Sequence, residues 1–135
     1  MSMFSVFDIS ASAMSAQSQR MNVTASNMAN ADSVAGPDGE AYRAKQVMFE
    51  TQSQAANGVG GVRVSQVIDD PSPMRTEYRP DHPLADEEGY VTMPNVEPVN
   101  EMVNMIAASR SYQANVEVMN TSKTLMLKTL TLGEN

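Results

Sequence analysis

The single histidine of this sequence is its first candidate for chemistry. His82 stands in "RPDHPLAD", with Asp81 and Asp86 close by along the chain. A metal site needs three or four convergent ligands, and a catalytic histidine needs a positioned partner to move its proton. Neighbouring carboxylates in a proline-rich loop supply neither arrangement. We therefore interpret His82 as an ordinary loop residue.

Acidic and glycine-rich stretches are the remaining candidates. "DEEG" (86–89) and "DDP" (69–71) lack the ligand spacing of a calcium-binding loop, and the acids of "DEEG" share one turn instead of flanking a substrate. "NGVGGV" (57–62) lacks the lysine and the following helix of a phosphate-binding loop. The absence of cysteine excludes thiolate metal sites and cysteine nucleophiles. The sequence predicts no enzyme, no metal site and no cofactor.

The composition favours a protein whose partners are other proteins. The 135 residues suit one domain, and 12 of them are Met while Trp is absent, which gives a flexible and adaptable apolar surface. The net charge of -7 argues against nucleic acid, because phosphate binding needs clustered Lys and Arg. The sequence contains neither a basic, apolar signal peptide nor a run of about 18 apolar residues. We expect neither a Sec-type address nor a membrane span.

Charge density divides the chain into three parts. Residues 1–35 hold three charged side chains, residues 36–95 hold ten acids and five bases, and residues 96–135 hold four acids and three bases. This division predicts an N-terminal helix over 1–35 and a small β-rich and loop-rich module over 36–95. A C-terminal helix is expected over 96–135.

The middle part shows the alternation of short strands. Gly, Pro, Asp and Asn are dense in "AGPDGEAY", "NGVGG", "DDPSP", "RPDHP" and "DEEGY", which predicts turns. Between the turns, "GVRVSQVID" places Val62, Val64 and Ile68 on one face of a strand. The predicted strands are residues 46–50 and 61–69, with weaker candidates at 74–78 and 90–93.

The two ends have the period of long helices. Apolar residues recur at alternating spacings of four and three, which is the pattern of a coiled-coil seam. Pro94 and Pro98 mark the entry into the second helix. The expected fold class is mainly α with a small β-rich insert, in which the long N- and C-terminal helices pair as a coiled coil with short strands and loops between them. The predicted seam residues are Phe4, Phe7, Ala11, Met14, Met21, Ala25, Met28, Met102, Met105, Tyr112, Val116, Met119, Met126 and Leu130.

The helix faces outside these seams carry little charge. "RMNVTASNMANADS" (20–33) shows Ser, Ala, Asn and Thr where a solvated coiled coil displays Glu and Lys. A lone helix pair with Met and Ala at its seam buries little apolar surface, so we infer that the ends order on assembly, with the seams as assembly interface. A self-contained coiled-coil adaptor is the alternative. Polar contacts that fix helix register are expected from Asn27, Asn30, Gln113 and Asn115.

Four stretches resemble the bacterial flagellar axial proteins, the rod and hook family. "SQRMNVTASNMANADS" is similar to the N-terminal signature of that family, and "ASRSYQANVEVMNTSKTLMLKTLTLG" is similar to its C-terminal signature. "GPDGEAYRAKQVMFE" and "PDHPLADEEGYVTMPNVEPVNEMVNMI" resemble the proximal-rod branch, and the short chain length agrees with that branch. Met28 and the pair Asp32 and Ser33 depart from the commonest residues of the wider family, while Met28 keeps the seam apolar.

The resemblance implies a structural subunit of the proximal rod, the drive shaft that carries motor torque through the periplasm to the hook. In that family the paired terminal helices form a tubular layer around the export channel. The implied partners are copies of the chain itself, other proximal and distal rod subunits, the adapter at the rod base, and the flagellar type III export apparatus. The resemblance also implies synthesis in the cytoplasm and export without a cleaved signal peptide. Phe4 and Phe7 either start the seam alone or also serve as an apolar handle for export.

Overall fold

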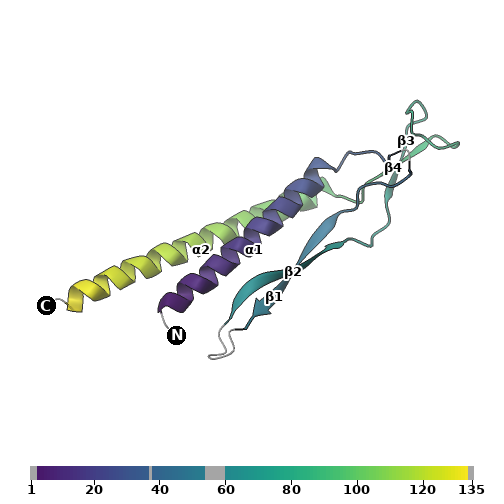
Figure 1. Ribbon diagram of the computed structural model, residues 1–135. Coiled ribbons are helices and arrows are strands. Elements are labelled where there is room, and N and C mark those ends of the chain that lie inside the picture. Colours follow the sequence, from purple (N-terminus) through teal and green to yellow (C-terminus); the bar gives the residue numbers. More distant parts are fainter. Residues whose placement is uncertain (1–2, 37, 54–59, 134–135) are drawn as a thin grey trace.

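Two long helices lie side by side, and a β-hairpin runs along one of them (Figure 1). The computed structural model describes residues 3–36, 38–53 and 60–133, so most of the turn expected at 57–61 lies outside the described residues. The prediction of a mainly α fold with a small β-rich insert is confirmed. The elements follow in the order α1 (Met3–Ala29), β1 (Lys45–Gln52), β2 (Gly61–Asp69), β3 (Arg75–Tyr78), β4 (Tyr90–Met93) and α2 (Pro98–Gly133).

The helix boundaries follow from local capping chemistry. At the end of α1, Asn30 Nδ2 donates to the Ser26 carbonyl at 2.8 Å, and the Ser33 hydroxyl donates to the Asn30 carbonyl at 2.8 Å. The same two carbonyls also accept the backbone N–H groups of Asn30 and Ser33, so the side chains reinforce the bonds that end the helix. α2 begins at Pro98, whose fixed φ suits the first helical position, and Glu101 places a carboxylate in the first turn.

α1 is the middle layer of the molecule. Among the described helices and strands, α2 packs against α1 alone, whereas α1 also packs against β1 and β2. Hydrogen bonds from Asn27 to Glu101 and from Arg20 to Asn104 fix an antiparallel register between the helices. The two expected helices are therefore present and adjacent, and the hairpin is positioned by α1.

β1 and β2 form an antiparallel hairpin that agrees with the predicted strands. Lys45 pairs with Asp69 at the base of the hairpin, and the register shifts once between Met48 and Phe49. The predicted inner face is confirmed, because its three aliphatic residues are half-buried while their polar neighbours along the strand are exposed. Those half-buried residues are Val62, Val64 and Ile68.

The hairpin meets α1 through a close backbone approach. The Ser12 hydroxyl accepts a hydrogen bond from Val62 N at 3.0 Å and donates to the Ile9 carbonyl at 2.7 Å. A Cβ at Gly61 would lie 2.3 Å from Ser12 Oγ, closer than van der Waals contact permits. Gly61 therefore leaves the space that the Ser12 side chain occupies where the hairpin approaches α1.

β3 and β4 form a second antiparallel sheet, which lies beyond the end of the helix pair (Figure 1). The pairing runs from Arg75 opposite Met93 to Tyr78 opposite Tyr90. The two tyrosine rings meet edge to face, with centroids 5.3 Å apart. Both of the weaker strand predictions are thus confirmed.

The buried core lies where β4 leads into α2. Val91, Met93 and Val96 are at most 2% exposed. Val96 also packs with Ala31 and Ala44, which lie between α1 and β1. This core joins the end of α1, the start of β1 and the start of α2, and it holds those three elements at one junction.

Candidate assembly surface

Asn27 connects α1, β1 and α2 at this junction and is 1% exposed. Its Oδ1 accepts hydrogen bonds from the Tyr42 hydroxyl and from Lys45 N, both at 2.9 Å. Its Nδ2 donates to the Lys45 carbonyl at 2.9 Å and to Glu101 Oε2 at 3.1 Å. Both lone pairs and both amide hydrogens are therefore used, which is the full capacity of an amide.

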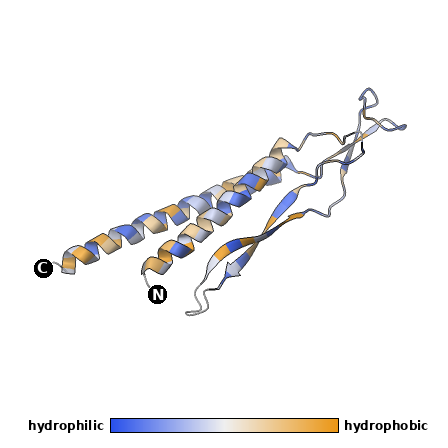
Figure 2. Ribbon diagram, viewed as in Figure 1, coloured by the Kyte–Doolittle hydropathy of each residue, from blue (hydrophilic) through white to orange (hydrophobic). Residues whose placement is uncertain are grey.

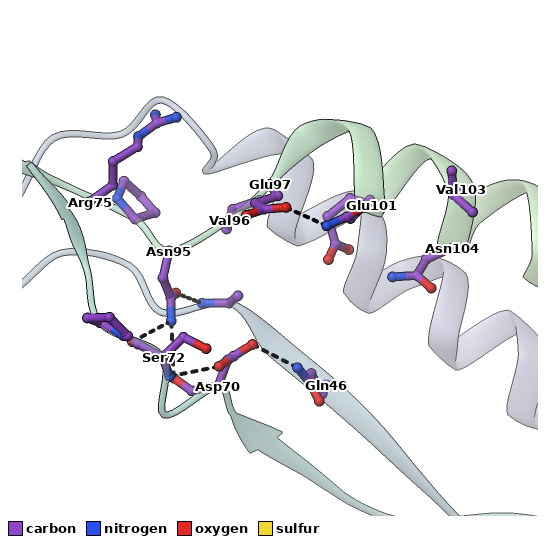
Figure 3. A pocket seen from close by; sticks show the side chains of 14 residues that line it. Gln46, Asp70, Ser72, Arg75, Asn95, Val96, Glu97, Glu101, Val103 and Asn104 are labelled. Atoms are coloured by element: carbon purple, nitrogen blue, oxygen red, sulfur yellow. Dashed lines mark hydrogen bonds between the residues drawn. The ribbon is translucent and has the colours of Figure 1, made fainter. Parts of the chain in front are cut away.

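A groove of about 810 Å³ opens beside this network, between the first turns of α2 and the segments around Asp70 and Asn95 (Figure 3). Asn95 Oδ1 accepts from Ala44 N at 2.8 Å. Asn95 Nδ2 donates to the Asp70 and Ser72 carbonyls at 3.1 and 3.0 Å. One amide thus fixes the shape of one wall of the groove.

The groove also presents carboxylates. Hydrogen bonds from Ser72, and a further one from Gln46, hold the pKa of Asp70 below its usual value. Figure 3 shows Glu97 at the start of α2, where Asn100 Nδ2 donates to its carboxylate. Arg75 lines the same groove. Asp70 is therefore ionised at neutral pH, and the groove has acidic positions on both of its sides.

The fully buried side chains of the two helices are small or polar. On α1 the buried residues include Ser10, Ala16 and Thr24, and on α2 the buried residue is Ala108. The distance between packed helices depends on the size of the side chains at the contact, and small residues permit a close approach. Much of the large apolar surface of α2 is therefore not used inside this chain.

The structure divides the predicted seam residues into two groups. On α1, one heptad position is half-buried within the chain and the other is exposed, and α2 follows the same division except that Tyr112 is exposed at the position where Met105, Met119 and Met126 are half-buried. The role of both groups as assembly contacts stays a prediction. The half-buried group is Phe7, Met14, Met21, Met28, Met105, Met119 and Met126, and the exposed group is Phe4, Ala11, Ala25, Met102, Tyr112, Val116 and Leu130.

α2 exposes further apolar side chains that the seam pattern did not include. Residues 99, 102, 103 and 106 have the spacing of one helix face, which was the available sequence signal. Figure 2 shows hydrophobic positions along α2 up to its C-terminal end. The additional exposed residues are Val99, Val103, Ile106, Val118, Leu125, Leu127 and Leu132.

The other predicted polar contacts have local roles or face outward. Asn30 caps α1, as described above. Asn115 Nδ2 donates to the Ser111 carbonyl of its own helix at 2.8 Å. Gln113 is exposed. Among these residues, Asn27 alone connects different elements through the contacts described, and its partners Tyr42 and Glu101 were not identified from the sequence.

The candidates for chemistry have structural explanations or remain isolated. His82 Nδ1 accepts a hydrogen bond from Leu84 N at 3.1 Å, which organises its own loop. Across residues 3–36, 38–53 and 60–133, no group of three or more His, Asp or Glu side chains could hold a metal ion. Neither of the two described helices is long and apolar enough to cross a bilayer.

Two family models match separate parts of the chain. Residues 7–37, which include most of α1, match the family described as flagella basal body rod protein. Residues 87–132, which include β4 and most of α2, match the family described as flagellar basal body rod FlgEFG protein C-terminal. The two matches therefore fall on the helices and not on the β1–β2 hairpin.

Curated relatives match over the full length. The flagellar basal-body rod protein FlgC of Yersinia enterocolitica is 66% identical over 134 residues, which is 99% of this chain and 100% of the relative. The FlgC proteins of Escherichia coli O157:H7 and Salmonella typhimurium are 60% and 58% identical over the same shares of the two chains. The chain therefore belongs to the FlgC family of flagellar basal-body rod proteins, which are structural subunits of the rod and not enzymes.

Proposed function

We propose that this chain polymerises through its terminal helices into the proximal rod, where it helps to form the drive shaft around the export channel. The observation that supports this most is the apolar surface of α2. Its side chains are exposed from Val99 to Leu132, although a helix in contact with water alone would have polar residues on that surface. Neighbouring subunits would cover it.

The seam residues divide naturally between contacts within a chain and contacts between chains. We propose that the half-buried group, such as Met14 and Met119, pairs α1 with α2 as a coiled coil. The exposed group, such as Met102 and Leu130, would complete the same packing against neighbouring subunits. Gln113, which is exposed, would make its polar contacts there too.

This packing would give the shaft its stiffness. Interdigitated helices on a cylinder resist twisting, because sliding one helix past another opens voids in a close-packed interface. We propose that residues 1–35 and 96–135 form this packed layer, and that residues 36–95 lie outside it. The β1–β2 hairpin, held against α1 by Ser12, would then follow the helix layer rigidly.

Delivery of the chain is the second part of the proposal. By its family, the chain would be made in the cytoplasm and exported to the periplasm by the flagellar type III apparatus without a cleaved signal peptide. A helix pair whose fully buried side chains are small or polar unfolds at low cost, which suits a narrow channel. Its partners in the rod would be copies of itself, the other proximal and distal subunits, and the adapter at the rod base.

The experiment replaces the chromosomal gene by one that encodes Met119→Lys, and motility and incorporation into isolated rods are measured. A charge placed in the seam carries a large desolvation cost, so we expect loss of motility and of rods. Gln66→Lys is the matched control, because Gln66 is exposed on β2 and its change adds the same charge. Motile cells with normal rods that contain Met119→Lys would overturn the proposal.

A further inference from the structure

The β3–β4 sheet and its loop project from the end of the molecule that lies opposite both termini (Figure 1). We call residues 75–90, which run from the start of β3 to the start of β4, the tip. Among the described helices and strands, β3 and β4 pack only on each other. The tip therefore presents its side chains away from the helix pair.

Two tyrosines stand out on the surface of the tip. Tyr78 is 62% exposed and Tyr90 is 43% exposed, although their rings contact each other edge to face. A shallow cavity of about 460 Å³ opens beside Tyr78 and is lined further by residues 79–83. Tyrosine is a frequent anchor of protein interfaces, because it offers a large ring with few rotatable bonds and a polar end.

Hydrogen bonds of the loop fix the position of these rings. Asp86 N donates to the Tyr90 carbonyl at 2.8 Å, and Asp86 Oδ1 accepts from Tyr90 N at 2.8 Å. Arg79 N donates to the carbonyl of Gly89, which has a φ of 85°. A Cβ at Gly89 would lie 2.9 Å from Tyr78 Cε2, so the loop backbone packs directly on the ring. A ring that is already ordered loses little entropy when a partner binds.

The charge around the tyrosines is acidic. Residues 75–90 hold five acids and two bases. One of the bases, Arg79, is engaged by Glu77 at 3.0 Å. Asp81, Glu87 and Glu88 are exposed, and across the described part of the chain they form no ion pair. A partner that reaches the tyrosines therefore meets an excess of negative charge.

A cationic side chain fits this combination of groups. The face of an aromatic ring attracts a cation, and the attraction adds to that of nearby carboxylates. Arginine suits both groups at once, because its planar guanidinium stacks on a ring while its N–H groups donate to a carboxylate. Asp81 lines the same cavity as Tyr78 and supplies such a carboxylate. A phosphate or another anion would be repelled, and a neutral sugar would gain nothing from the acids.

We propose that the tip is a docking site for a protein segment that presents an arginine, with the guanidinium stacked on Tyr78 and its N–H groups directed to Asp81. The exposed carboxylates of Glu87 and Glu88 attract the same segment from a longer range. The site belongs to the β-rich module and not to the terminal helices. It therefore goes beyond the proposed function and gives the chain a second surface for a different kind of partner.

Amide chemical shifts of the isotopically labelled full-length chain test this site. The probe is a blocked tripeptide, glycine–arginine–glycine, and the matched control peptide has citrulline in place of arginine, which keeps the planar group and removes its charge. We expect the arginine peptide to shift the amide signals of residues 77–90. The citrulline peptide should shift them far less, and added salt should weaken the arginine peptide because it screens the carboxylates.

Substitutions separate the ring from the charge. Tyr78→Leu keeps an apolar side chain and removes the ring, so the affinity for the arginine peptide should fall about two- to fivefold. Tyr78→Phe keeps the ring and should bind almost as the unmodified chain does. Asp81→Asn should also weaken binding. Glu40→Gln removes an exposed acid outside the tip and serves as the control, for which we expect no change.

Several results would overturn the proposal. They are the absence of shifts at the tip, equal shifts with the arginine and citrulline peptides, and full binding by Tyr78→Leu. Shifts at the tip with chitotetraose but not with the arginine peptide would identify a carbohydrate site instead, which also overturns it. All of these measurements use the free chain, so such a failure leaves the proposed function standing.

Discussion

The segment that leads into α2 and the C-terminal half of that helix differ in what covers them. In the segment, Val96 and Met93 are buried, and in the first turn of α2 Glu101 accepts a hydrogen bond from Asn27, an amide with all four of its hydrogen bonds made. From Arg110 to Gly133 no residue is buried, and the leucines there are more than half exposed. The chain therefore completes the packing of the junction by itself, whereas α2 leaves apolar side chains exposed along its length.

This difference separates the two tasks of the chain. A subunit needs one part that folds from its own contacts, so that its helices and hairpin leave a common junction in fixed directions. It also needs a part whose packing is completed by neighbours. Apolar surface that is already buried within the chain contributes nothing to assembly. Substitutions in the two parts should accordingly affect different measurements.

The largest expected effect on the isolated chain is that of Met93→Ala. Met93 is 0% exposed, and truncation of a buried Met costs about 2 to 5 kcal/mol because it removes apolar contact and leaves a cavity. Met102→Ala removes the same atoms from a side chain that is 56% exposed, so we expect about 0.5 kcal/mol or less. Urea unfolding measures both. Equal losses of unfolding free energy in the two variants would contradict the distinction between the part that folds from its own contacts and the part that neighbours complete.

Asn27→Ala comes next, with an expected loss of about 2 to 3 kcal/mol. It leaves Lys45 N and the Tyr42 hydroxyl without the acceptor that they share, and buried unsatisfied groups are costly. Asn115→Ala is the matched control, since that amide bonds to a carbonyl of its own helix. We expect the control to differ from the unmodified chain by about 0.5 kcal/mol at most. A harmless Asn27→Ala would show that the junction does not depend on this amide.

Leu130→Lys should leave the stability of the isolated chain almost unchanged but impair assembly in cells, which is the opposite of the effect expected at the junction. Leu130 is 67% exposed, so we expect about 0.5 kcal/mol or less of change in the unfolding free energy of the isolated chain. In cells we expect loss of motility, because the charge would be buried against a neighbour. Circular dichroism and a swarming assay give the two readings. Normal swarming would mean that the end of α2 stays in contact with water.

The smallest expected effect concerns pH. Ser72 and Gln46 hold the pKa of Asp70 below its usual 3.8, so the stabilisation from Asp70 is complete above that value and is lost as pH falls through the lower folded pKa. Asp70→Asn should remove this part of the acid dependence of unfolding, so that the variant is slightly less stable than the unmodified chain above pH 5 and matches it at the acid end. Glu87→Gln, in the β3–β4 loop, serves as control. If the unfolding free energy of Asp70→Asn falls with decreasing pH as it does in the unmodified chain, Asp70 is not the source of this acid dependence.

The elements themselves could be predicted from the sequence. Alternation identified residues 61–69 as a strand, and the long apolar period identified both helices, because regular structure leaves its own period in the chain. The face of each helix that lies inside was harder to predict. α2 is apolar on several sides, so the spacing of Met102, Tyr112 and Leu130 does not distinguish a contact within the chain from an exposed position.

The junction itself was not predicted. Asn27 was named from the sequence only as one of four residues expected to make polar packing contacts, because an amide in a water-excluded interface must find partners. Its bonds to Lys45 and Glu101 depend on the meeting of segments that are far apart in the chain, which no local pattern specifies. The same holds for Asn95, whose role comes from the return of the 70–72 segment to the start of α2. Contacts between segments that are far apart in the chain leave no periodic pattern in the sequence from which they could be predicted.

Residue-resolved amide hydrogen exchange on the purified full-length chain tests the central claim most directly. We predict protection around residues 27, 44 and 93–108, and fast exchange over the last part of α2, from about residue 110 to 132. In isolated rods the same C-terminal stretch should become protected. Strong protection of residues 110–132 in a monodisperse solution of the free chain would mean that α2 is complete by itself, and it would contradict the account.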